Sequence, residues 1–342
     1  MRLTRRGGGV VVVAAAGFAL AGLFGARAIN AVVLPAAVAM AAAYLQLRTF
    51  PVPDLARDLP PDDFVGETAT VELRFEGVSR PFAGRVTDEL SEGLSGDAAG
   101  DVAVGGDPFV YEVTYERRGV HTLGPATVVG RDVFGLLERE LRVPNTDELL
   151  AYPTVYRLGR AAQHELLGLR ETERSEERDE FDRLREYDRG DALRNVNWKA
   201  SAKRDELVVT EFAAAADVSA VTVAASASAE GADRMAEAAA SVTLALLDVD
   251  VPVRLVLPTE TVEVESGVTG RRRLLEACAL TTAGSAADAD ADIVLRATGD
   301  GVTVAVDGLE HDFDGLRVGS GPRSRPIAED GSRPDDHEEV AV

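Results

Sequence analysis

The residues best suited to chemistry lie in one segment, residues 181–212, which reads FDRLREYDRGDALRNVNWKASAKRDELVVTEF. It contains the only tryptophan of the chain and its only two lysines. The Gly-Asp pair at its centre is typical of a turn that can cap a short helix, and its arginines can pair with carboxylates to fix a loop to a sheet. The alternative is a surface that docks a partner, because tryptophan and arginine dominate interface hot spots. The residues that define this segment, called the signature below, are Arg185, Tyr187, Gly190, Asp191, Arg194, Trp198, Lys199 and Ser201.

Familiar catalytic motifs do not occur in the chain. The sequence has no G-x-x-x-x-G-K-[ST] phosphate loop, no H-E-x-x-H, no G-x-S-x-G and no C-x-x-C. His164 and Glu165 lie beside two leucines, which is more typical of a loop or strand edge than of an acid–base pair. With one cysteine, Cys278, and four scattered histidines, the sequence predicts no metal cluster, no cofactor and no enzyme activity.

The charge balance restricts the classes of partner. The chain has 58 acidic and 36 basic residues, for a net charge of -22. Phosphate binding requires a basic face, so nucleic acid is excluded as a partner. A lysine-poor chain with acids spread over several regions is typical of adaptation to high intracellular salt, as in a halophile.

The first 48 residues predict a transmembrane hairpin. Two apolar runs, residues 10–25 and 28–47, follow a basic start and are separated by a short break around Arg27. Arg48 and Arg57 follow the second run, and this distribution of charge predicts that both termini lie in the cytoplasm of a two-span cell-membrane protein. The rival interpretation is a secretory signal cleaved at Ala26-Arg27-Ala28, which would make the chain an exported surface module.

The pattern of the chain changes after the hairpin. Residues 49–61 are rich in proline and predict a linker. Polar and apolar residues alternate in short stretches over residues 62–150, which predicts a small antiparallel β-sandwich. Strands and helices alternate in residues 151–318, which indicates an α/β domain, and residues 319–342 predict a disordered acidic tail.

The signature spacing resembles the domain of unknown function 58 (DUF58) family, in which LR-x-Y-x-x-G-D-x-x-R-x-x-x-W-x-x-S-A-[KR] precedes a strand. Two earlier segments also resemble the family: R-G-V-H-T-L-G-P at residues 118–125 and D-V-F-G-L at residues 132–136, where Val133 replaces the more usual proline. We interpret Gly119, Gly124 and Gly135 as turn residues and expect Phe134 to pack. The resemblance covers about residues 117–282.

The same resemblance implies a von Willebrand factor A-like (Rossmann-like) fold for the α/β domain. In von Willebrand A domains the first strand ends in D-x-S-x-S, which binds a divalent cation. Here Ser226 and Ser228 fall in register, but Ala224 stands at the aspartate position. Two hydroxyls without a carboxylate are weak ligands for a hard cation, so these positions predict a degenerate site, with the serines as an N-capping and turn pair for the next helix.

These observations together predict a membrane-anchored, non-catalytic interaction or adaptor protein. The family resemblance implies that its partners are MoxR-type AAA+ ATPases or von Willebrand A proteins, and that it has an assembly or chaperone-like role. Two alternatives remain open, an exported binding module and an uncharacterised hydrolase. The hydrolase would require the polar residues of the signature to converge on a concave pocket.

Overall fold

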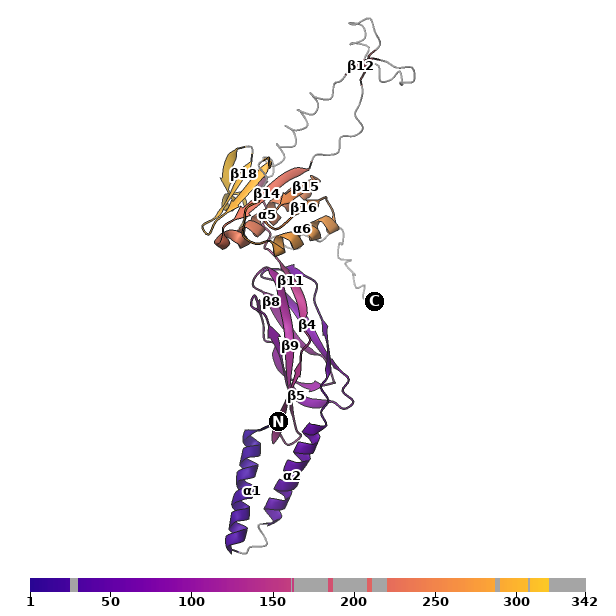
Figure 1. Cartoon of the computed structure of the whole chain (residues 1–342), viewed down its shortest axis with the longest axis vertical. Coiled ribbons are helices and arrows are strands. Elements are labelled where there is room, and N and C mark those ends of the chain that lie inside the picture. The colour runs from indigo at the N-terminus through magenta and orange to yellow at the C-terminus, as the bar shows by residue number, and fades with distance from the viewer. Residues whose placement is uncertain are drawn as a thin grey trace, which may run out of the picture. The chain divides into compact units, whose positions relative to one another are not determined.

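The computed structural model describes residues 1–24, 30–160, 162, 184–186, 208–210, 220–286, 290–306 and 308–319 (Figure 1). The chain divides into two compact units, Met1–Tyr152 and Pro153–Val342, called unit 1 and unit 2. The break falls close to the boundary at residue 150 that the change of sequence pattern indicates.

Unit 1 is built from two β-sheets that enclose one core. Neighbouring strands run antiparallel except β3 and β11, which are parallel. The seven-stranded sheet contains β1 (Arg2–Leu3), β3 (Asp63–Phe64), β5 (Phe82–Leu90), β7 (Ala99–Val104), β9 (Gly119–Arg131), β10 (Leu137–Val143) and β11 (Asp147–Tyr152). The four-stranded sheet has the order β2 (Asp54–Asp58), β4 (Thr68–Glu76), β8 (Phe109–Tyr115) and β6 (Leu94–Ser95).

The core of unit 1 follows from the two-residue period of its strands, which turns alternate side chains toward the opposite sheet. On β8, Tyr111, Val113 and Tyr115 are buried, while the residues between them are more exposed. Val86 of β5 and Val128 of β9 belong to the same apolar cluster. The two sheets are therefore held together by one continuous apolar layer.

Two helices precede the sheets, α1 (Arg5–Phe24) and α2 (Asn30–Arg48), and they contact each other. No helix in the described part of the chain combines the length and the apolar character that crossing a membrane requires. The predicted transmembrane hairpin is therefore wrong, and so is the two-span location with cytoplasmic termini that depended on it.

The sequence of each helix explains this correction. The first turn of α1 is formed by two arginines and three glycines, so its apolar stretch is residues 10–24, about 22 Å long against a hydrocarbon core of about 30 Å. The second apolar run was counted to residue 47, but Ala43 and Leu47 are buried and Leu47 belongs to the core of unit 1. The end of the second run thus packs against protein.

The segment predicted as a proline-rich linker contains strand β2, at the edge of the four-stranded sheet. Prolines at residues 51, 53, 60 and 61 flank this strand but do not interrupt it, which is where a sheet edge tolerates proline. Arg57, which follows the second apolar run, lies on β2 with its side chain fully buried.

Unit 2 contains a six-stranded mixed sheet with the order β16 (Thr261–Val264), β15 (Val253–Val256), β14 (Val221–Ala227), β17 (Ile293–Ala297), β18 (Val302–Val306) and β19 (Leu309–Asp312). Strand β14 runs parallel to both β15 and β17, and the outer strands are antiparallel. The described part also includes a 3-10 turn (Ala229–Gly231), α5 (Ala232–Leu247), α6 (Val268–Leu280) and α7 (Phe313–Leu316).

Small side chains let α5 pack closely against this sheet. Helix α5 contacts β14, β15 and β17, and α6 contacts α5 and β16, with both helices on the same side of the sheet in Figure 1. Alanine has the highest helix propensity and lets the helix approach its neighbours, so the alanine-rich sequence of α5 suits both requirements. In the described part of unit 2 the buried polar residues are Ser241, Thr243 and Thr281.

Candidate functional site

Most of the signature lies outside the described residues. Arg185 is the exception, because its backbone belongs to β12 (Leu184–Glu186), which pairs with β13 (Val208–Thr210) in an antiparallel two-stranded sheet. In this register Arg185 lies opposite Val209. Tyr187, Gly190, Asp191, Arg194, Trp198, Lys199 and Ser201 are not described, nor is the His164-Glu165 pair. Whether the signature docks a partner or fixes a loop stays a prediction.

Of the predicted cation-site positions, Ser226 and Ser228 lie at the carboxyl end of β14, and Ala224 lies in the middle of the strand. The chain passes from β14 to β15 on one side and returns to β17 on the other, so this strand end is where the strand order reverses. Ligands of open α/β sheets bind in the crevice at such a reversal. Ala224, at the position where a carboxylate would coordinate a cation, is buried and only 3% exposed.

A loop of the chain itself closes this strand end. The backbone amide of Ala286 donates a hydrogen bond of 2.9 Å to the Ser226 hydroxyl. Ala227 and Gly284 exchange two backbone hydrogen bonds, of 2.8 and 3.0 Å, so the loop is joined directly to the strand. One acceptor position of the Ser226 hydroxyl is therefore occupied by a hydrogen bond within the fold. In the described ranges no group of three or more His, Cys, Asp or Glu side chains is close enough together to hold a metal ion.

Ser228 is the residue before the 3-10 turn, but its side chain forms no capping hydrogen bond. The prediction that both serines act as an N-capping pair is therefore wrong for the side chain of Ser228. Gly231 lets the start of the helix approach β17 closely, because a Cβ atom there would lie 2.7 Å from the Ala297 carbonyl carbon.

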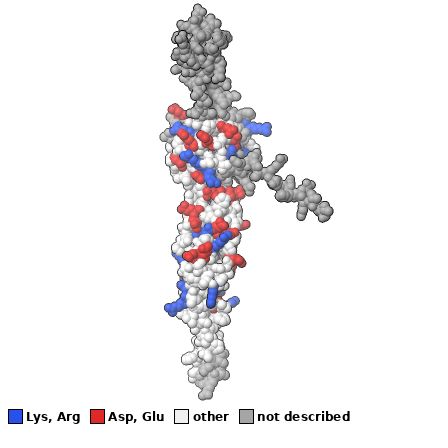
Figure 2. All heavy atoms as spheres, turned by 90° about the vertical axis from the view of Figure 1, so that its right-hand side faces the viewer, with Lys and Arg blue, Asp and Glu red and all other residues white. Residues whose placement is uncertain are grey.

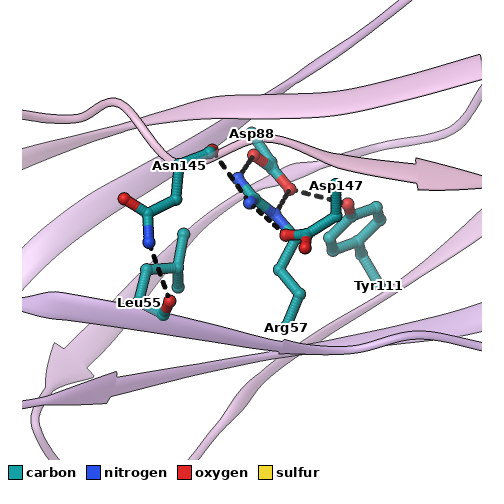
Figure 3. Close-up of polar contacts among 6 residues, drawn as sticks. All are labelled: Leu55, Arg57, Asp88, Tyr111, Asn145 and Asp147. Carbon is teal, nitrogen blue, oxygen red and sulfur yellow. Dashed lines mark hydrogen bonds and ion pairs between the residues drawn. The ribbon is translucent and has the colours of Figure 1, made fainter.

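The densest group of buried charges lies in unit 1 (Figure 3). Arg57 on β2 donates from Nε and Nη2 to the two carboxylate oxygens of Asp88 on β5, at 3.1 and 2.8 Å. Its Nη1 donates to Asp147 at 2.8 Å and to the Asn145 carbonyl oxygen at 2.9 Å. Tyr111 donates a third hydrogen bond of 2.9 Å to Asp88. We call these residues, Arg57, Asp88, Tyr111, Asn145 and Asp147, the Arg57 cluster.

The electrostatics of the Arg57 cluster indicate a structural role. Burial lowers the pKa of Arg57, but the hydrogen bonds and charges of Asp88 and Asp147 outweigh it, and its net pKa is raised. Burial, followed by the charge and the hydrogen bond of Asp88, raises the pKa of Tyr111. An arginine that stays protonated and a tyrosine that is harder to ionise are poor acid–base catalysts near neutral pH. The cluster connects both sheets and holds their register.

Gly124, in the R-G-V-H-T-L-G-P segment, makes room for this cluster. Its φ is 91°, and a Cβ atom there would lie 2.5 Å from both Arg57 Nη2 and the Asn145 carbonyl oxygen. Gly135 also has positive φ and lies in the turn between β9 and β10, as predicted. Gly119 is the first residue of β9 and Gly124 lies within that strand, so the prediction that these two are turn residues is wrong. The segment thus contributes space for a buried ion pair, a role that its spacing did not reveal.

The D-V-F-G-L segment forms a turn that one carboxylate organises. Asp132 is buried and accepts hydrogen bonds from the amides of Phe134, Leu136 and Leu137 at 2.8, 2.7 and 2.6 Å. The Val133 amide donates to Gln46 Oε1 on α2 at 3.3 Å, a bond that proline could not form. We call residues 132–137 the Asp132 turn.

The Asp132 turn leaves two apolar side chains in solvent. Val133 is 81% exposed and Phe134 is 58% exposed, so Phe134 packs less completely than we expected. The carboxylate closes the turn by collecting its amides, and the side chains between those amides point outward. The aspartate two residues before an aromatic residue was the available signal, because such a side chain commonly bonds the backbone that follows it.

Comparison with known proteins gives one family match. Residues 183–306 match the family described as protein of unknown function DUF58. The comparison with curated proteins gave no match. Among solved structures, a conjugative transposon lipoprotein from Bacteroides eggerthii DSM 20697 is 17% identical, over 29% of this chain and 96% of that one, with a TM-score of 0.19. The segment that contains the signature and most of the unit 2 sheet therefore carries the DUF58 match.

Proposed function

We propose that this chain is a non-catalytic adaptor that binds protein partners. The observation that carries the proposal is the Asp132 turn, which holds Val133 and Phe134 in solvent on a backbone already fixed by four hydrogen bonds. Binding to a preorganised loop loses little conformational entropy, and an exposed aromatic side chain is a typical interface anchor.

We further propose that unit 2 is a von Willebrand factor A-like domain whose cation position has been lost. The parallel arrangement of β15, β14 and β17 supports the fold, and the alanine at the carboxylate position supports the loss. The bond from Ala286 to Ser226 adds support, because it engages a hydroxyl that a cation would otherwise use. An adaptor of this kind would bind partners through side chains and not through a bridging metal.

The partner that we propose is a MoxR-type AAA+ ATPase or another von Willebrand A protein. This choice rests on the DUF58 resemblance. The direct test uses the purified full-length chain and a purified MoxR-type ATPase encoded in the same genome, with binding measured by biolayer interferometry. We expect the double variant Val133→Ala/Phe134→Ala to weaken binding about tenfold or more, as for loss of an anchor.

Val120→Ala is the matched control, because Val120 lies on β9 of the same unit and is 50% exposed. It should bind like the wild type. Arg194→Ala tests the signature in the same assay. Failure of the wild type to bind would refute the proposed partner, whereas wild-type affinity of the double variant would refute the Asp132 turn as the contact surface.

A further inference from the structure

An apolar groove lies between α1, α2 and the Asp132 turn. Its volume is about 660 Å³, within the range of about 300–1,000 Å³ that is usual for small-molecule sites. Val10 and Val13 of α1, Ala36 and Ala39 of α2, and Phe134 of the turn form its walls, and Arg6 is the one charged residue that lines it. The groove can therefore take an apolar chain with one charged end.

The end of the groove at the Asp132 turn is fixed by hydrogen bonds. The Thr4 hydroxyl donates to the Gly135 carbonyl oxygen at 2.6 Å, and the Thr4 amide donates to the Leu136 carbonyl oxygen at 3.0 Å. The Gly7 amide donates back to the Thr4 hydroxyl at 3.0 Å. The start of α1 is therefore held against the turn, and Arg6 is held near Gly135, where a Cβ atom would lie 4.0 Å from Arg6 Nη1.

The charge around the groove selects an anion. The first 53 residues contain five arginines and no acidic residue, in a chain whose net charge is -22. Within the residues that the structure describes, Arg6 forms no ion pair. Figure 2 shows acidic and basic side chains mixed over the strands and few charged side chains of either sign over the helices.

The helices beside the groove also expose large apolar side chains. Val12, Phe18, Leu34, Val38 and Leu45 are each more than 60% exposed. Large apolar side chains exposed close together are typical of a binding surface in a folded protein. The groove lies next to Arg6, so it favours an amphiphile, whose charged head can pair with this arginine. A purely apolar ligand would leave Arg6 without a partner.

We propose that this groove binds a single-chain amphiphile with an anionic head, such as a long-chain carboxylate. The chain would lie between α1 and α2 against Val10, Val13 and Ala39, and the head would pair with Arg6. Phe134 belongs to both proposals, because it lines the groove and is an anchor of the proposed partner surface. The groove is therefore tested through Arg6 and Ala39, which the partner proposal does not use.

The test is a titration of the full-length chain with cis-parinarate, a long-chain carboxylate whose fluorescence rises in apolar surroundings, at concentrations where the probe is monomeric. Saturable binding by the wild type is expected. Ala39→Phe should weaken it about tenfold or more by filling the groove, and Arg6→Gln should weaken it about threefold to fivefold, as for loss of one exposed ion pair.

Two matched variants serve as controls. Ala37→Phe adds the same ring to α2 at an exposed position that does not line the groove, and Arg5→Gln removes the same charge one residue away from Arg6. Both should bind the probe like the wild type, and circular dichroism should show that all four variants keep their helices.

The proposal is overturned if Ala39→Phe and Ala37→Phe bind equally well, or if Arg5→Gln and Arg6→Gln lose affinity to the same extent. It is also overturned if the chain binds only vesicles of anionic phospholipid and not the monomeric probe, since a surface and not the groove would then be the site. Equal affinity for a long-chain quaternary ammonium would contradict the role of Arg6.

Discussion

Unit 1 buries charged side chains, whereas the described part of unit 2 buries only hydroxyl groups. In unit 1 the buried polar residues include Asp88 and Asp132, and in the described ranges of unit 2 they are Ser241, Thr243 and Thr281. Each buried carboxylate has specific compensation: Asp88 accepts from Arg57 and Tyr111, and Asp132 accepts from three amides. Unit 1 is therefore stabilised in part by buried polar interactions, and the described part of unit 2 is stabilised mainly by apolar packing.

The comparison indicates that the buried charges of this protein stabilise its fold and do not form a catalytic or ligand-binding site. Carboxylates are buried where they fix sheets and turns, while the strand end at which an α/β sheet usually binds ligands is closed by neutral groups. Neither location has the exposed, partly compensated charge of a catalytic site. Among the described residues, the Asp132 turn and the groove of unit 1 are the exposed features for which we propose binding.

The substitution expected to have the largest effect on the buried polar interactions of unit 1 is Arg57→Met. Removing the guanidinium leaves Asp88 buried without its ionic partner, so we expect unit 1 to lose about 3–5 kcal/mol of stability, measured by urea denaturation and by hydrogen exchange of unit 1 peptides. The double variant Arg57→Met/Asp88→Leu should recover most of the loss. If the single variant loses less unfolding free energy than the double variant, the Arg57 cluster does not hold the sheets together.

The converse test places a carboxylate in unit 2, as Ala224→Asp. The side chain would be buried without a compensating charge, so we expect unit 2 to lose roughly 3 kcal/mol of stability, measured by hydrogen exchange of unit 2 peptides. Millimolar Mg²⁺ should restore none of it, because one carboxylate and two hydroxyls, one of which already accepts from Ala286, are a weak ligand set for a hard cation. Rescue of Ala224→Asp, but not of Ala224→Asn, by Mg²⁺ would show that a latent cation site survives.

Alkaline pH should weaken unit 1 through Tyr115. Burial, followed by the charges of Asp63 and Asp62, raises the pKa of Tyr115 from 10.0 to about 12. The unfolded chain therefore releases this proton first, and stability is lost as the pH rises from about 10 toward 12. Between pH 9 and pH 11.5 we expect the wild type to lose about 2 kcal/mol more than Tyr115→Phe, from parallel urea titrations. Equal losses would contradict the raised pKa.

The smallest effects should come from two tyrosines on the same strand. Tyr111 donates a hydrogen bond to Asp88, whereas the buried Tyr115 hydroxyl has no hydrogen-bond partner among the described residues. Tyr111→Phe should therefore cost about 1–2 kcal/mol, and Tyr115→Phe should be neutral or stabilise unit 1 by about 1 kcal/mol at pH 7. Thermal melts of both variants measure the difference, and a reversed order would show that Tyr115 has a partner that compensates it.

Regular periodicity made much of the fold predictable from the sequence. The apolar pattern of residues 302–306 indicates a strand, and these residues form β18 with the same bounds. Polar and apolar residues alternate over residues 68–75, which correspond to β4, although β4 ends one residue later. Strand β5 was not predicted, because its inward-facing positions include Gly84 and Asp88. Those two residues hide the alternation, and the partner that explains Asp88 lies 31 residues away.

The contacts that explain the sites are also long-range. Arg57 looks like a solvent-exposed charge in a proline-rich segment until Asp88 and Asp147 are brought beside it. Phe134 looks like a core residue until the Asp132 carboxylate closes the turn beneath it. Local propensity and spacing do not report such pairings, so the family motifs could be located in the sequence while their physical roles could not.

The conformation of the Asp132 turn does not depend on the side chain that the turn exposes. Its conformation depends on one carboxylate and on backbone amides, and the side chain of Val133 contributes little buried surface to it. Many residues other than proline could stand at position 133 without changing the path of the chain. A single substitution at Val133 can therefore change the surface that the turn offers to a partner, while the rest of unit 1 keeps its structure.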